Sequence, residues 1–294
     1  MNILITGITT GFGFITTKKL LKNGHTLLSP VRGGWDRLKE DLDFVQAKQN
    51  GKLIVVDLDL TNSSRLNELK FIIETQFKFR LDVLIHNAGL GILMPFELQN
   101  ENDIRQQFDV NFFAPLEITR LLLPALRFSK GKIICVSSVA GLVSIPFYST
   151  YCASKYALEA WAESLSSELS HQGIPICLVE PGGYVTEFAN RSRTKMKFEI
   201  PNHLKDIYQK TLNGFHNMME SKSKAGQNPI HVANRIVKLA ESPHPKFRNI
   251  MGIDAWFAYV ASRILPRETF RKTISLAYRF LVNRFSSDNA RVSE

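Results

Sequence analysis

The feature that most constrains this chain is a regular alternation of short apolar runs and amphipathic segments, which starts at the first residue. Apolar runs typical of buried parallel strands occupy residues 2–6, 26–29, 53–57, 81–86, 132–137 and 174–180. Segments with helical spacing separate them, over residues 11–22, 35–47, 101–128 and 151–169. A further helix, which Thr61 would cap, is expected between the third and fourth runs. Strands that alternate with helices in this way require a parallel sheet with right-handed crossovers.

The pattern predicts the α/β class and a single-domain Rossmann fold, a doubly wound parallel sheet of about seven strands with helices on both faces. Residues 247–251 are the candidate seventh strand, after a helix over 229–240. Because the chain shows neither an internal repeat nor a low-complexity linker, we expect residues 1–252 to form one domain. Within it, residues 182–226 hold no clear strand and are long enough for a substrate loop or mobile lid.

Charge and cysteine content exclude several classes of protein. The chain has 37 basic and 27 acidic side chains, a net charge of +10, which suits a nucleic acid, an anionic membrane or a phosphate-rich cofactor. It carries no nucleic-acid-binding motif, so we expect no nucleic-acid partner. Its three cysteines, Cys135, Cys152 and Cys177, lack metal-site spacing and are expected to be reduced thiols, with no metal bound. We find neither a signal-peptide pattern nor about 18 consecutive apolar residues, which predicts a cytoplasmic protein.

The first predicted strand runs directly into a glycine-rich turn, TGITTGFG at residues 6–13. Glycines in such a turn let the chain bend tightly and bring backbone N–H groups to a pyrophosphate at the N-terminus of the next helix. An ordinary glycine-rich turn would also give this spacing, but its position between the first strand and the first helix favours phosphate binding. The cofactor-binding residues expected here are Thr6, Gly7, Thr9, Gly11, Phe12 and Gly13.

This Thr-Gly-x-x-x-Gly-x-Gly turn resembles that of the short-chain dehydrogenase/reductase family. Two further motifs follow in the family's order, HNAG at residues 86–89 and YCASK at residues 151–155. The resemblance covers about residues 2–190. It implies an oxidoreductase that transfers hydride between a nicotinamide cofactor and a carbonyl or alcohol.

The YCASK motif supplies the expected acid/base pair, Tyr151 and Lys155. Residues four apart on a helix share one face, which brings the ammonium near the phenol. A free tyrosine has a pKa near 10, and a neighbouring cation lowers that pKa towards the working range. A lone Tyr-x-x-x-Lys pair is also common on exposed amphipathic helices, so its role here depends on the accompanying motifs.

The resemblance implies two further catalytic residues. Ser138, which lies 13 residues before Tyr151, matches the serine that polarises the substrate oxygen, and Ser137 is the less favoured neighbour. Asn111 matches the asparagine that bends its helix and holds a water passing protons to Lys155.

The end of the second strand indicates which cofactor is used. In Rossmann sites an acidic residue there binds the ribose of NAD, and an arginine accommodates the 2′-phosphate of NADP. The acidic position falls on Val31 and the next residue is Arg32. This favours NADP over NAD, although a solvated surface arginine would look the same in the sequence.

Other cofactor contacts are implied by the resemblance alone. Asp59 matches the aspartate that binds the adenine amino group, and Asp57 is its competitor because only the register of the strand end separates them. His86 is expected to be a packed structural group. The remaining cofactor contacts implied are Leu60, Asn87, Ala88, Gly89, Lys155, Pro181, Gly182 and Thr186.

The expected substrate is a bulky apolar ketone or secondary alcohol, steroid-, retinoid- or fatty-like. The segments that would line the cleft are apolar: residues 90–94, residues 139–143, Phe147 and the aromatic-rich stretch after Gly182. The same residues would also suit ordinary core packing. A non-catalytic NADP-binding regulator on the same fold is the alternative; a sugar-nucleotide epimerase or dehydratase would need a larger C-terminal domain.

Residues 253–294 are expected to form a helical C-terminal extension packed on the same domain. Two amphipathic helices meet at Pro266, and residues 263–285 carry six basic side chains against Glu268. Such helices cap a substrate cleft, pack on a twin subunit, or lie peripherally on an anionic membrane. By resemblance, a homo-oligomer, a dimer or tetramer, is expected through the helices at 101–128 and 151–169.

Overall fold

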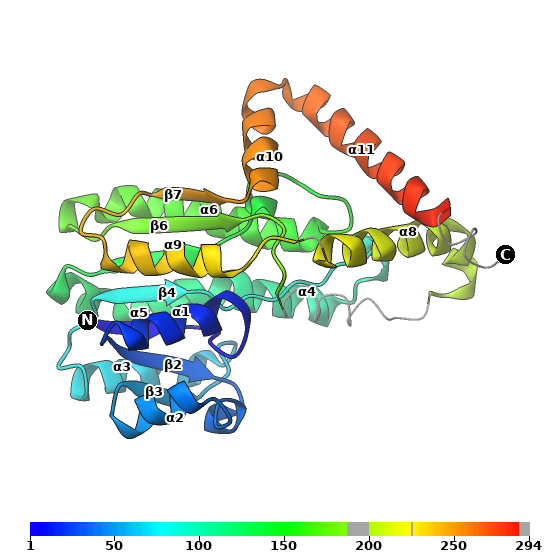
Figure 1. Cartoon of the computed structure of the whole chain (residues 1–294). Coiled ribbons are helices and arrows are strands. Elements are labelled where there is room, and N and C mark those ends of the chain that lie inside the picture. The colour runs from blue at the N-terminus through cyan, green and yellow to red at the C-terminus, as the bar shows by residue number, and fades with distance from the viewer. Residues whose placement is uncertain (187–199, 225, 288–294) are drawn as a thin grey trace.

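A seven-stranded parallel sheet forms the centre of the protein, as seen in a computed structural model that describes residues 1–186, 200–224 and 226–287 (Figure 1). The strand order is β3-β2-β1-β4-β5-β6-β7. The strands are β1 (Asn2–Ile5), β2 (Thr26–Val31), β3 (Leu53–Asp57), β4 (Val83–His86), β5 (Lys132–Val136), β6 (Ile176–Pro181) and β7 (Arg248–Met251). This confirms the predicted fold class, a doubly wound Rossmann sheet.

The order of the strands determines where a ligand can bind. The chain winds outwards from β1 through β2 to β3, then crosses back to β4 and continues to β7. The direction therefore reverses between β1 and β4. In open parallel sheets, ligands bind at such a switch point, outside the carboxyl ends of the strands.

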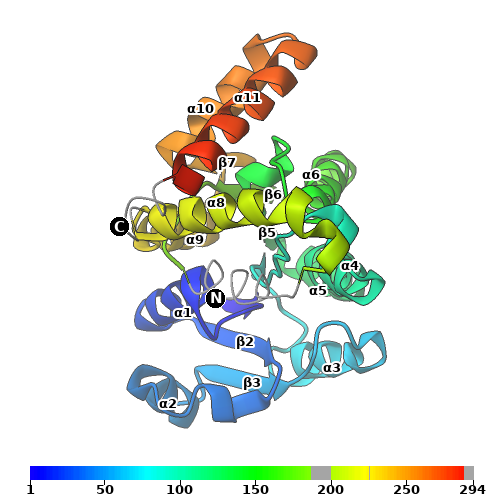
Figure 2. The same ribbon diagram turned by 90° about the vertical axis from the view of Figure 1, so that its right-hand side faces the viewer.

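Helices cover both faces of the sheet, because alternate strand residues point to opposite sides. Helices α1, α2 and α9 pack on the face that includes Ile3 and Ile85, and α3, α5 and α6 pack on the face that includes Leu4 and Leu84 (Figure 2). The described helices are α1 (Gly11–Lys22), α2 (Leu42–Gln49), α3 (Asn67–Thr75), α4 (Glu101–Phe108), α5 (Ala114–Ser129), α6 (Ser149–Leu169), α8 (Lys205–Lys224), α9 (Ile230–Glu241), α10 (Ile253–Ile264) and α11 (Arg267–Ser287).

Two local predictions were wrong. The helix predicted over 35–47 is a short 3-10 turn followed by α2, because the Asp41 carboxylate accepts a hydrogen bond from Phe44 N and starts the helix there. Thr61 does not cap α3; its N–H and hydroxyl bond the Asp59 carboxylate instead. The helical region predicted over 101–128 is present as α4 and α5, joined by a π-helical turn at Asp109–Phe113, where the resemblance implied a bend.

The last two helices leave the sheet. Helix α10 rises from the end of β7, and α11 turns back towards α8, which it contacts (Figure 1). The stretch 182–226, in which we predicted no clear strand, contains α8 and a single bridge between Tyr184 and Gln227; its residues 187–199 and 225 lie outside the described residues. No helix in the described part of the chain is both long and apolar enough to cross a membrane.

Candidate active site

The carboxyl ends of β1 and β4 are bound together at the switch point. The Thr6 hydroxyl accepts hydrogen bonds from the backbone N–H groups of Asn87 and Ala88, both at 3.0 Å. The Asn87 side-chain amide donates to the carbonyls of Thr6 (3.0 Å) and Gly7 (2.9 Å). Thr6 is buried, so its side chain braces the two strands and does not face the site. Asn87 has the bracing role expected for it.

Neighbouring His86 is a structural group. Its side chain is buried, and its Nε2 lies 2.8 Å from the Thr119 hydroxyl. Burial lowers its pKa to about 3, which keeps the ring neutral. The packed role predicted for this histidine agrees with its surroundings.

The backbone of the glycine turn is packed too closely against itself and the residues after β4 to accept side chains at Gly7 or Gly13. Gly7 has φ +74°, and a Cβ there would lie 2.8 Å from Ala88 Cα. A Cβ at Gly13 would lie 2.1 Å from the Gly7 carbonyl oxygen. The turn leads into α1, whose N-cap Thr10 makes no side-chain capping bond. The N–H groups of the first turn of α1 are therefore available to an anion such as a pyrophosphate.

Arg32 and Asp59 come together beyond the ends of β2 and β3. The Arg32 guanidinium is exposed and lies 3.7 Å from the Asp59 carboxylate. Burial tends to raise the pKa of Asp59, but hydrogen bonds from Thr61 and the charge of Arg32 hold it below its ordinary value. The competitor Asp57 accepts a hydrogen bond from Gly33 N at 2.9 Å and so closes the loop after β2. Asp59, rather than Asp57, is the carboxylate beside Arg32.

The four residues expected to be catalytic come from three parts of the fold. Ser138 follows β5, Tyr151 and Lys155 lie on α6, and Asn111 lies in the π-helical turn. The Ser138 hydroxyl is hydrogen-bonded to the Tyr151 phenol. The Lys155 ammonium donates to the Val136 carbonyl at 3.0 Å and lies 6.0 Å from the centroid of the Tyr151 ring. The structure therefore brings serine, tyrosine and lysine together.

The electrostatics of this group differ from the sequence prediction. Burial raises the pKa of Tyr151, and its hydrogen bond with Ser138 offsets only part of that rise. Burial also lowers the pKa of Lys155, to about 8, although the charge of Glu159 acts in the opposite direction. The pKa of Tyr151 is therefore raised in this state and not lowered as predicted, and desolvation of the phenol is the largest cause. A neutral phenol is a proton donor.

Asn111 connects the π-helical turn to the neighbouring segments. Its Oδ1 accepts from Leu90 N at 2.8 Å, and its Nδ2 donates to the Leu90 carbonyl at 2.8 Å and to the Ser154 hydroxyl at 3.0 Å. The helix is distorted here, as the resemblance implied. The water-holding role of Asn111 stays a prediction.

The segment after β6 lies over the glycine turn. The Tyr184 ring packs edge-on against Phe12, with 5.6 Å between centroids, and a Cβ at Gly11 would lie 3.7 Å from Thr186 Cβ. Pro181 is buried at the end of β6, and Gly182 N donates to the Met251 carbonyl at 2.9 Å. Thr186 thus lies beside the glycine turn, and Pro181 and Gly182 lie at the carboxyl ends of β6 and β7.

A buried cluster behind Lys155 was missed by sequence reasoning. Arg248 Nη1 donates to the Glu159 carboxylate at 2.8 Å and to the Glu180 carboxylate at 2.6 Å. Glu180 is fully buried, and burial together with the Glu159 charge raises its pKa to about 8. The available signal was Glu159 itself, one helical turn after Lys155. The other two members of the cluster, Glu180 and Arg248, lie in β6 and β7, and no rule of sequence spacing relates them to Glu159.

Aromatic side chains from distant helices form a wall beside Tyr151. Its ring packs 6.1 Å from Tyr148, which packs 6.1 Å from Phe215 of α8. Phe147 packs 5.1 Å from Phe215 and 5.5 Å from Tyr278 of α11. All distances are between ring centroids. Phe147 was expected at the cleft, whereas the contribution of Tyr278 from the C-terminal helix was not.

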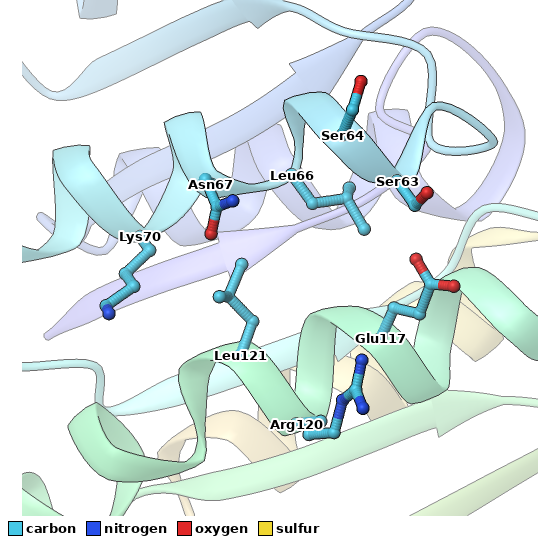
Figure 3. A pocket seen from close by; sticks show the side chains of 8 residues that line it. All are labelled: Ser63, Ser64, Leu66, Asn67, Lys70, Glu117, Arg120 and Leu121. Atoms are coloured by element: carbon cyan, nitrogen blue, oxygen red, sulfur yellow. The ribbon is translucent and has the colours of Figure 1, made fainter.

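A separate hollow of about 580 Å³ lies between α3 and α5 (Figure 3). Figure 3 shows Glu117 and Arg120 of α5 opposite the polar side chains of α3 and the turn before it. The lining residues are Ser63, Ser64, Leu66, Asn67, Lys70, Glu117, Arg120 and Leu121. These residues belong to one helical face of the sheet, so the hollow is distinct from the group around Tyr151.

Comparison with known proteins shows the family. The family profile described as short chain dehydrogenase matches residues 1–197, about two thirds of the chain. The chain belongs to the short-chain dehydrogenase family. This is a family of oxidoreductases, and the match includes the glycine turn, Ser138 and the Tyr151–Lys155 pair.

Two curated relatives cover most of the chain. The 3-ketodihydrosphingosine reductase of Bacteroides thetaiotaomicron is 32% identical over 253 residues, which is 85% of this chain and 87% of the relative. Retinol dehydrogenase 7 of Rattus norvegicus is 28% identical, over 90% of this chain and 84% of the relative. The similarity therefore extends beyond the part that the family profile matches.

Two solved structures share the fold. A short chain dehydrogenase from Burkholderia cenocepacia in complex with NADP superposes with a TM-score of 0.70 at 21% identity, covering 93% of this chain and 96% of that one. A short chain dehydrogenase/reductase from Burkholderia phymatum in complex with NAD gives 0.72 at 23% identity, covering 92% and 94%.

Proposed function

We propose that this dehydrogenase transfers hydride between NADP(H) and a carbonyl/alcohol pair on a bulky apolar substrate, with Tyr151 as the general acid/base. The observation that carries the proposal is the Ser138–Tyr151 hydrogen bond, with Lys155 one helical turn further along α6. This group stands at the carboxyl edge of the sheet, where the fold places ligands.

The glycine turn fits a dinucleotide, because Gly7 and Gly13 let the backbone pack closely at the end of β1 and the first turn of α1 can present its N–H groups to a pyrophosphate. The NADP preference rests on Arg32, which is exposed and adjacent to Asp59, at the end of a strand where Val31 replaces an acidic residue. Similar structures hold NADP in one case and NAD in another, so this arginine is the deciding feature. The residues that would hold the cofactor are Gly7, Thr9, Gly11, Phe12, Gly13, Arg32, Asp59, Leu60, Ala88, Gly89, Lys155, Pro181, Gly182 and Thr186, with Thr6 and Asn87 bracing the turn.

The protein residues supply orientation and a proton. The cofactor, when bound, carries the hydride. The Ser138 hydroxyl donates a hydrogen bond to the substrate oxygen and polarises the carbonyl, while Tyr151 gives its phenolic proton to that oxygen. The Lys155 ammonium stabilises the phenolate that remains. Because the pKa of Lys155 is about 8, the lysine can exchange protons near neutral pH and return one to Tyr151. Oxidation of an alcohol follows the same steps in reverse.

The substrate class follows from the wall beside Tyr151. Tyr148, Phe147, Phe215 and Tyr278 form a continuous aromatic cluster there, in which Phe215 is fully buried. Aromatic walls bind large apolar groups and leave the orientation of the reacting oxygen to a few polar side chains. The relatives named for 3-ketodihydrosphingosine and for retinol are consistent with a substrate that has a long hydrocarbon part. On this proposal, residues 1–252 are the catalytic unit, and the extension after them completes the substrate wall.

The test is a titration of the protein with NADPH and NADH, followed by a panel of apolar ketones assayed with wild type, Tyr151→Phe and Tyr156→Phe. Tyr156 lies on the same helix and is more exposed. We expect tight NADPH binding by all three proteins and a loss of turnover of about 10²- to 10⁴-fold in Tyr151→Phe alone. Turnover that survives in Tyr151→Phe, or NADPH binding with no turnover of any ketone by wild type, would contradict the proposal.

A further inference from the structure

Helix α10 exposes a continuous apolar stripe. Ile253, Trp256, Phe257 and Ile264 are 72%, 53%, 63% and 75% exposed. Their spacing of three, four and seven residues places them on one face of the helix. The opposite face holds the buried Ala255, and the helix contacts β7. An exposed apolar surface of this kind marks an interaction site.

Helix α11 has two apolar faces with different surroundings. Tyr278 points inwards and packs against Phe147 in the wall beside the catalytic group. Leu276 and Phe280 are 65% and 66% exposed and lie one turn apart on another face, in line with Lys272. The apolar residues of the inner face are therefore explained by the packing of α11 on the protein. Packing does not explain the exposed apolar residues of the outer face.

The two helices, residues 253–287, form an arm with a strong excess of positive charge. It carries six basic residues and two acidic ones, Asp254 and Glu268. Asp254 accepts a hydrogen bond from Gly183 N at 2.7 Å, and Glu268 pairs with Arg271. The basic residues are Arg263, Arg267, Arg271, Lys272, Arg279 and Arg284.

This charge decides between the possible occupants of the stripe. A second copy of the chain would bring one basic arm against another, and juxtaposed like charges disfavour association. Exposed aromatic and aliphatic side chains bordered by lysine and arginine match the interface of an anionic bilayer. Since no described helix can span a membrane, the arm would lie on the surface. We propose that the α10–α11 arm docks the protein onto an anionic lipid surface through the stripe of α10 and the outer face of α11.

Docking would orient the active site towards the lipid. Helix α10 begins at the Asp254 contact with the loop after β6, and α11 supplies Tyr278 to the aromatic wall. The arm is thus attached both to the cofactor side and to the substrate side of the site. Docking itself is independent of the proposed reaction, and its test uses no activity measurement.

The experiment is co-sedimentation of the full chain with vesicles of phosphatidylcholine alone and of phosphatidylcholine with phosphatidylglycerol. We expect binding to the anionic vesicles only, weakening as salt increases. Vesicles with brominated acyl chains should quench the fluorescence of Trp256, while Trp35 and Trp161, which pack against the core, stay unquenched.

Two double variants on the arm and two controls test the surface. Each cation near an anionic bilayer contributes about fivefold in affinity, so Lys272→Glu/Arg279→Glu should weaken vesicle binding by about 25-fold or more. Phe257→Ser/Phe280→Ser should weaken it without changing the net charge. Lys19→Glu/Lys22→Glu changes the net charge equally on α1, and Phe71→Ser removes an equally exposed aromatic on α3; neither should affect binding. NADPH affinity and thermal unfolding check that each variant folds.

Three outcomes would overturn the proposal. The first is that wild type stays in the supernatant with anionic vesicles. The second is that Lys19→Glu/Lys22→Glu loses as much binding as the arm variant, which would show a general charge effect. The third is a dimer in analytical ultracentrifugation that Phe257→Ser/Phe280→Ser converts to a monomer while vesicle binding is absent. That result would assign the stripe to a second copy of the chain.

Discussion

Arg32 and Asp59 face each other beyond adjacent strands, with 3.7 Å between the Arg32 Nη1 and the Asp59 Oδ2. One residue follows β2 and the other follows β3, so the pair exists only because these strands are neighbours in the sheet. On the proposed function, this exposed arginine binds the 2′-phosphate of NADP.

Arg32→Ala should therefore change cofactor preference. A charge-assisted hydrogen bond contributes about 1.5–3 kcal/mol, so we expect NADPH to bind about 10- to 100-fold more weakly and NADH to be unaffected. Fluorescence titration of both cofactors measures this. Lys52→Ala is the control, because it removes an exposed cation at the opposite end of β3. Equal weakening of NADH and NADPH would mean that Arg32 does not discriminate between them.

Gly13→Ala should abolish cofactor binding. The added Cβ would lie 2.1 Å from the Gly7 carbonyl oxygen and 2.3 Å from the Asn87 amide, so the turn must open. Gly24→Ala is the matched control: a Cβ there meets no atom within 4 Å, and φ is +83°. It should lower the unfolding free energy by about 1 kcal/mol through backbone strain alone and leave NADPH affinity intact. Normal NADPH binding by Gly13→Ala would show that the turn is not the phosphate cradle.

Glu159→Gln should shift the pH profile of turnover. The negative charge of Glu159 raises the pKa of Lys155, which burial lowers to about 8. Without that charge the lysine loses its proton at lower pH, so the alkaline limb of kcat moves to lower pH, with a loss of about threefold or more at pH 8. Glu163→Gln is the control, because Glu163 contacts the same arginine but is largely exposed. If the alkaline limb of kcat is unchanged in Glu159→Gln, Glu159 does not raise the pKa of Lys155.

Arg248→Met should destabilise the fold in a pH-dependent way. Removing the cation that contacts a buried carboxylate typically costs about 3–5 kcal/mol. The pKa of Glu180 is raised to about 8 from an ordinary 4.5, so folding takes up a proton and stability falls as pH rises through this range. In Arg248→Met the pKa rises further, and the loss of stability should grow towards alkaline pH.

Urea unfolding between pH 5 and pH 9 tests this prediction. Arg105→Met is the control, since Arg105 forms an exposed pair with Glu101 one helical turn away, and such pairs contribute about 0.3–0.5 kcal/mol. A destabilisation by Arg248→Met that stays constant with pH would show that the carboxylates titrate independently of the guanidinium.

Local patterns were sufficient to predict most of the fold. The strand at residues 53–57 and the helix at residues 11–22 were predicted with the bounds that the structure has, because apolar periodicity and flanking glycines are read within a few residues. Where a side-chain contact starts a helix, the prediction failed, because Asp41 starts α2 later than expected. The π-helical turn at Asp109–Phe113 lies where the family resemblance, and not local spacing, implied a bend.

The candidate site was likewise predictable from the sequence only in part. The sequence by itself determined the glycine turn and the Tyr151–Lys155 spacing, since both depend on distance along one short segment. Only the tertiary structure decided that burial raises the pKa of Tyr151, that Arg248 joins Glu159 to Glu180, and that Tyr278 packs against Phe147 near the catalytic group. Desolvation and contacts between residues far apart in the chain arise only when the elements pack, and no local spacing encodes them.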